Sequence, residues 1–202
     1  MEEQRHKNFG FVSGIPKNVT FEGAKRKKRY LSFEVMCPGH DGSLTAYGRM
    51  RGDETELKSF HTFCEKNPGS PVRLKGVINQ FTSNDEGARR LTNFTFFRWE
   101  PAVTGDYKAA FVVIGELLGK DISEGEGMLT ITISRPTNQE GEEQTESEPL
   151  VFHVINSKEI EELTEGSLIE IKGKLRPRTP ESEYGEATSP IRPYVEKIRI
   201  IG

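Results

Sequence analysis

The stretch VRLKGVI, residues 72–78, alternates apolar and polar side chains and places a glycine where a strand can bend. A looser copy, IEIKGKL, occupies residues 169–175, and the Lys-Gly pair keeps its place in both. Alternation with a period of two is typical of a strand with one buried face. The recurrence indicates an internal duplication, so we predict two related domains.

Further alternating stretches extend this pattern through the first half of the chain. We predict strands at residues 9–15, 30–36, 44–50, 71–81 and 91–100. Residues 53–69 change the period, because Leu57, Phe60 and Cys64 recur at helical spacing. Asp53, three residues before a glutamate, predicts the N-cap of this helix. The order is therefore three strands, one helix and two strands.

The second half repeats this order. We predict its strands at residues 109–119, 128–135, 149–156, 167–177 and 193–202, with a short helix at residues 157–166. Five short strands with a helix between the third and the fourth describe the OB-fold, a small Greek-key barrel. The sequence thus predicts an all-β protein of two tandem OB-fold barrels, each of order β-β-β-α-β-β. We place the first in residues 1–100, a linker in 101–107 and the second in 108–202.

The two predicted domains differ in charge. Residues 1–100 carry 17 Lys and Arg against 12 Asp and Glu, whereas residues 101–202 carry 11 against 19. A basic half joined to an acidic half indicates two modules with different roles. We expect the first to bind nucleic acid and the second to serve association or partner binding.

Several classes of protein are not expected from this sequence. No apolar run approaches the roughly 20 residues of a membrane span, and no secretory signal is expected at the start. Cys37 and Cys64 do not make a disulfide framework, so we expect a cytoplasmic protein with no membrane partner. No catalytic motif or phosphate-binding loop is found, which predicts a non-enzymatic protein without a cofactor.

Four of the predicted strands carry a resemblance to a known family. FVSGI (11–15), LSFEV (31–35), PVRLKGVI (71–78) and FTFFRWE (94–100) resemble the bacterial single-stranded DNA-binding protein family. The resemblance covers the whole first half, and the second half repeats it more loosely. It implies an OB-fold and binding to single-stranded DNA. Family members usually carry one OB-fold per chain and an acidic tail that recruits partners; this chain has two predicted barrels and ends in the apolar EKIRIIG (196–202).

The candidate binding residues follow from the OB plan, in which the loops joining strands one to two and four to five flank the outer face of strands two and three. Cations can track a phosphate backbone there while aromatic rings stack on unpaired bases. The predicted nucleic-acid-binding residues are Lys25, Arg26, Lys27, Lys28, Arg29, Tyr30, Tyr47, Arg49, Arg51, Arg73, Lys75, Arg89 and Arg90.

The spacing of two cysteines and two histidines could indicate a metal site. Cys37 and His40 have the same spacing as His61 and Cys64, and zinc accepts such ligands. A full strand length separates the two pairs on the predicted barrel, so we predict no metal site and leave zinc to metal analysis.

The sequence therefore predicts non-sequence-specific binding of single-stranded DNA in support of DNA replication or recombination. An adaptor of the primosome or replisome that mainly binds replication proteins is the first alternative. Single-stranded RNA binding is the second, because stacking and phosphate contacts do not distinguish the sugars. A monomer and a homodimer both stay open.

Overall fold

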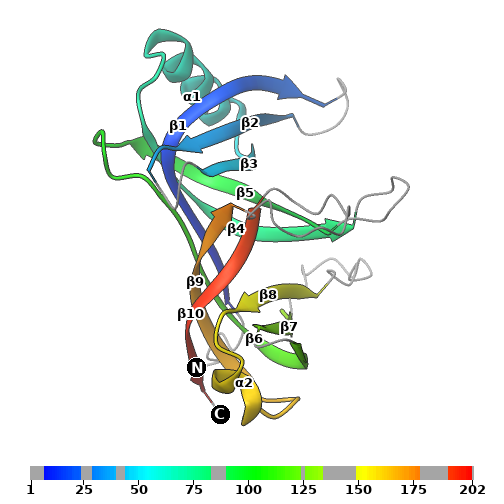
Figure 1. Ribbon diagram of the computed structural model, residues 1–202. Coiled ribbons are helices and arrows are strands. Elements are labelled where there is room, and N and C mark those ends of the chain that lie inside the picture. The colour runs from blue at the N-terminus through cyan, green and yellow to red at the C-terminus, as the bar shows by residue number, and fades with distance from the viewer. Residues whose placement is uncertain are drawn as a thin grey trace, which may run out of the picture. The chain divides into compact units, whose positions relative to one another are not determined.

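The computed structural model describes residues 7–23, 29–39, 44–82, 90–123, 126–133, 149–177 and 191–201 (Figure 1). Strands dominate these residues, which confirms the predicted all-β fold. The chain divides into two compact units, each described by itself below. The N-terminal unit consists mainly of Phe9–Phe111, and the C-terminal unit consists mainly of Val112–Gly173 with the segment that starts at Pro193.

The N-terminal unit is a ring of five strands. They are β1 (Lys7–Glu22), β2 (Tyr30–Cys37), β3 (Leu44–Met50), β4 (Val72–Thr82) and β5 (Arg90–Pro101). They lie in the order β2-β3-β5-β4-β1, and β1 also pairs with β2, so the ring closes. β3 and β5 run parallel, and the helix α1 (Glu54–Lys66) connects β3 to β4. This is the strand order and helix position of an OB-fold.

Alternation along the strands separates the core from the surface, as predicted. Leu31, Phe33 and Val35 of β2 are buried, whereas the intervening residues are partly exposed. On β5, Phe94 and Phe96 are fully buried. Their rings lie parallel with centroids 5.4 Å apart, and this aromatic pair forms the centre of the core.

Helix α1 begins as the sequence predicted. The Asp53 side chain accepts a hydrogen bond from the Glu56 backbone N–H at 2.8 Å, which satisfies one of the free donors of the first turn. Phe60 is fully buried, 5.1 Å from the Phe33 ring and 5.3 Å from the Trp99 ring. Cys64, which we expected on the same buried face, is only half-buried.

Strand β1 differs from the prediction, because it continues through residues that read as a loop. We expected it to end at residue 15, but it extends to Glu22 and its second half pairs with β2. The pairing is interrupted by a bulge between Lys17 and Thr20, where Asn18 has a positive φ of 53°. Asn18 lies within this bulge, and Pro16 lies just before it.

Gly76 allows β4 to bend. The register of β4 and β5 shifts between Lys75 and Gly76. A Cβ atom at Gly76 would overlap the Thr95 carbonyl oxygen, so only glycine fits this close approach. The Lys75-Gly76 pair thus marks a bulge in β4.

The C-terminal unit repeats the arrangement. Its elements are β6 (Lys108–Ser123), β7 (Glu126–Thr132), β8 (Leu150–Val154), α2 (Lys158–Glu161), β9 (Leu168–Pro177) and β10 (Ile191–Ile200). The strand order is β6-β7-β8-β10-β9, and β9 also pairs with β6. The helix is much shorter than the ten residues expected, and Ser157 makes no side-chain capping bond. In the described part of the chain, no helix is long and apolar enough to span a membrane.

Candidate nucleic-acid interface

The outer face of the N-terminal unit is built by β2 and β3. In register, Ser32 lies opposite Arg49, and Glu34 lies opposite Tyr47. These four side chains point outward because their neighbours on each strand are buried. Strand β5 runs parallel to β3 and extends this outer face. Because Gly48 pairs with Phe94, Asn93 lies beside Tyr47.

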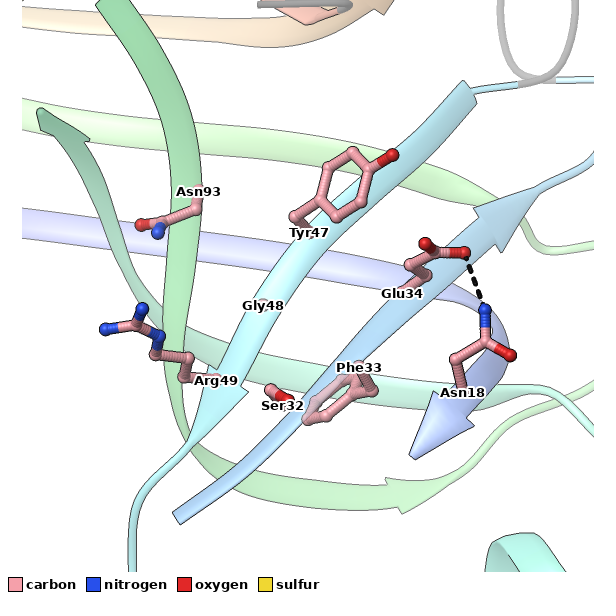
Figure 2. Close-up of a pocket in the computed structure, with 8 residues that line it drawn as sticks. All are labelled: Asn18, Ser32, Phe33, Glu34, Tyr47, Gly48, Arg49 and Asn93. Atoms are coloured by element: carbon pink, nitrogen blue, oxygen red, sulfur yellow. Dashed lines mark hydrogen bonds between the residues drawn. The ribbon is translucent and has the colours of Figure 1, made fainter. Parts of the chain in front are cut away.

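An open hollow of about 350 Å³ lies on this face (Figure 2). It is lined by Asn18, Ser32, Phe33, Glu34, Tyr47, Gly48, Arg49 and Asn93. Tyr47 and Arg49 project from β3, and Glu34 projects from the neighbouring strand β2 (Figure 2). Aromatic, cationic and acidic groups therefore share one surface of the OB-fold.

The aromatic and cationic groups are the ones that the sequence predicted here. Tyr47 is 45% exposed, and Arg49 is exposed two residues further along β3. The Arg49 guanidinium carbon lies 5.2 Å from the centre of the Tyr30 ring, a cation–π contact that orients the cation. Arg29 and Arg51 are both exposed. Arg29 precedes β2 and Arg51 follows β3, and these two strand ends adjoin because Leu31 pairs with Met50. Tyr30, Tyr47 and Arg49 therefore share the outer face of β2 and β3.

Glu34 introduces a negative group that the prediction did not assign to the site. Its Oε2 atom accepts a hydrogen bond from Asn18 Nδ2 at 3.2 Å, as the dashed line in Figure 2 shows. The positive φ of Asn18 at the β1 bulge brings its amide to this position. The hollow therefore holds a carboxylate oriented by a backbone irregularity.

Arg73 and Lys75 do not line the hollow. They lie towards the start of β4 and form ion pairs there. Arg73 donates to Glu100 at 3.3 Å and to Asp106 at 3.2 Å, and these hydrogen bonds raise the pKa of the guanidinium above its ordinary value. Lys75 lies 3.6 Å from the same Glu100 carboxylate. Nearby carboxylates neutralise both cations, so they attract phosphate less than Arg49 does.

The remaining predicted cations lie in the two loops or, for Arg90, at the start of β5. Arg90 is half-buried, and its Nε donates to the Gln80 side-chain oxygen at 2.9 Å. It alternates in phase with the buried Thr92 and Phe94, so it lies on the inner side of β5. Lys25, Arg26, Lys27, Lys28 and Arg89 lie outside the described residues.

The Cys and His residues do not form a metal site in the described part of the chain. No group of three or more His, Cys, Asp or Glu there could hold an ion. His40 lies outside the described residues. The Cys37 thiol is buried and donates to the Ser13 carbonyl at 3.4 Å. Burial raises its pKa to about 12, which disfavours the thiolate that zinc binds.

Of the eight lining residues, only Tyr47 and Arg49 were predicted as site residues, and three of the others show why. The alternation of β2 points Glu34 outward, but an exposed acid on a strand is common and carries no signal for a site. Asn93 reaches the hollow only because β5 pairs with β3, which lies more than 40 positions earlier in the chain. The position of Asn18 at the hollow depends on the bulge in β1, which lies beyond the predicted end of this strand.

Comparisons with known proteins identify the fold. No protein-family model and no curated protein matches the chain in sequence. The wild-type single-stranded DNA-binding protein of Thermus aquaticus aligns over 98% of this chain and 94% of its own, with a TM-score of 0.69 and 12% identity. A deletion variant of that protein aligns over 99% and 97%, with a TM-score of 0.67 and 13% identity. The alignment spans both halves of this chain, so the predicted OB-type fold is confirmed. A single chain of the Thermus aquaticus protein has elements that match both halves.

Proposed function

We propose that this chain binds single-stranded DNA across the outer face of β2 and β3 in its N-terminal unit. Phosphates contact Arg29, Arg49 and Arg51, and unpaired bases stack on Tyr47 and Tyr30. The observation that carries the proposal is the half-exposed Tyr47 ring next to the exposed Arg49 in one open hollow. Cations beside stacking rings are the combination by which OB-folds hold single strands.

The fold and the chemistry of the face support this proposal from separate directions. The Thermus aquaticus protein with the same fold is a single-stranded DNA-binding protein. Unpaired bases expose their flat faces, which a duplex hides, so a surface with aromatic rings favours single strands over duplex. The two loops add further phosphate contacts through the cations of Lys25–Lys28 and Arg89. Protection of exposed strands during replication or recombination follows as the cellular role.

The acidic C-terminal unit has a different proposed role. Its strongly negative segment suits association or the binding of a protein partner more than a second phosphate track. In this unit, the largely buried Glu170 carboxylate pairs with Lys172 at 3.2 Å and with Arg199 at 2.7 Å. These two cations are thus already paired with an acid.

Titration with short oligonucleotides tests the proposal. An oligo-dT of about 12 nucleotides falls within the span of one OB-fold and should quench the tyrosine and tryptophan fluorescence of the protein. Each phosphate contact contributes about −0.7 to the slope of log K against log salt for a single strand. Arg49→Gln should therefore make this slope less negative by about 0.7. Oligo-U and duplex in the same titration measure sugar and strand preference.

Arg98→Gln is the matched control. Arg98 is an exposed arginine of the same unit, but it lies on β5 opposite Lys75 and outside the hollow. Its substitution should leave the salt slope unchanged. Equal slopes for the two variants, or a duplex that binds as tightly as oligo-dT, would contradict the proposed interface.

A further inference from the structure

The hollow contains a carboxylate that phosphate binding alone does not explain. Glu34 lies in the middle of the outer face, directly opposite Tyr47 on the paired strand. A carboxylate repels phosphate, so the DNA backbone must pass the hollow on its Arg49 side. What can approach Glu34 is a group that donates hydrogen bonds, and on a single strand that group is the edge of a base.

The geometry places a base edge there. Residues directly opposite each other on antiparallel strands have Cβ atoms about 4.5–5.5 Å apart. A base stacked on the Tyr47 ring therefore extends beyond it over Glu34 on one side or Asn93 on the other (Figure 2). Asn18 holds Glu34 Oε2 in place by the 3.2 Å hydrogen bond, so the carboxylate is oriented before DNA arrives.

We propose that Glu34, oriented by Asn18, binds the Watson–Crick edge of the base stacked on Tyr47 and favours guanine. This inference rests on the proposed function, since it requires the stacked base. A carboxylate has two acceptor oxygens and no donor. Guanine offers two adjacent donors on that edge, N1–H and the 2-amino group, which match both oxygens.

The other bases fit the carboxylate less well. Cytosine and adenine present a single amino donor next to an acceptor nitrogen. Thymine presents one N–H between two carbonyl oxygens, which the carboxylate repels. Unpaired bases in single strands are commonly recognised by hydrogen bonds on this edge. Glu34 is thus a specificity residue superimposed on binding that otherwise tolerates every sequence.

Competition between oligonucleotides of equal length measures the preference. We compare oligo-dT with an oligomer that alternates thymine and guanine, and with one that alternates thymine and hypoxanthine, which lacks the 2-amino group. Lithium buffer suppresses four-stranded guanine assemblies. A good bidentate contact discriminates by about 5- to 150-fold. We expect the guanine oligomer to bind at least about fivefold tighter than oligo-dT, with the hypoxanthine oligomer between them.

Glu34→Gln should abolish this preference, because the amide replaces one acceptor by a donor of the same size and still accepts from Asn18. Glu65→Gln is the matched control: Glu65 is an exposed acid on α1 of the same unit and does not line the hollow. It removes the same charge and should raise the affinity for all three oligomers alike.

The outcomes separate the two proposals. A wild-type protein that binds all three oligomers equally tightly overturns the guanine inference and leaves single-strand binding intact. A preference that survives Glu34→Gln also overturns the inference. Failure to bind any of the oligomers overturns the proposed function together with it.

Discussion

Replacing Tyr47 by alanine removes the exposed ring of the hollow and leaves every cation in place. A base stacked on an aromatic side chain contributes about 1–3 kcal/mol to binding, judged by alanine substitution. Since a tenfold change in Kd corresponds to about 1.4 kcal/mol, Tyr47→Ala should raise the Kd for oligo-dT by about 5- to 150-fold. No charge is lost, so the salt dependence of binding should not change.

The effect on folding should be small by comparison. Tyr47 is 45% exposed at the surface of β3, and strand propensities at such positions span about 1 kcal/mol. Tyr47→Phe keeps the ring and should bind nearly as well as the wild type. Phe97→Ala is the matched control, because Phe97 is 46% exposed but lies outside the hollow, at the point where the β4–β5 register shifts.

Fluorescence anisotropy of a labelled oligo-dT at two salt concentrations measures both quantities, and thermal unfolding monitors the fold. A Kd for Tyr47→Ala within twofold of the wild-type value, in a protein that unfolds normally, would refute stacking at this ring. So would an equal loss of affinity in Phe97→Ala, which would indicate an indirect effect on the barrel.

Three further outcomes are expected. Replacing Lys25–Arg29 by serine should lower the affinity for every single strand alike, measured by the same anisotropy; a loss confined to one sequence would argue against phosphate contacts. Phe60→Ala should lower the free energy of unfolding by about 3–5 kcal/mol in urea titration, because its fully buried ring supports the core. Burial raises the pKa of Cys37 to about 12 and that of Cys64 to about 11. Both thiols should therefore react slowly with a disulfide reagent at pH 8, Cys64 faster, and the rates should rise with pH as thiolate forms.

The sequence pattern correctly predicted features that depend only on residues close together in the chain. The ends of β3 agree with the predicted residues, since the alternation from Leu44 to Met50 is uninterrupted. The N-cap of α1 was also predictable, because an Asp53 side chain satisfies a donor only three residues away. The extension of β1 was not, because a bulge with a positive φ at Asn18 has the same residue preferences as a turn.

The candidate site shows the same division. Tyr47 and Arg49 could be predicted as outward neighbours, because the period of a strand places them on one face. Their pairing with Glu34 depends on the register of β2 and β3. A slip of β3 by one residue would have turned Tyr47 and Arg49 to the buried face, away from Glu34.

Sequence alone therefore determined the order of strands and helices, the faces of most strands and the basic character of the first half, because each depends on residues close together in the chain. Tertiary structure decided which cations share a surface. It paired Arg73 and Lys75 with Glu100, separate from Arg49, and it brought Asn18 to Glu34 beside Tyr47. The physical reason is that hydrogen bonds between strands join residues far apart in sequence, and charge interactions depend on the resulting distances.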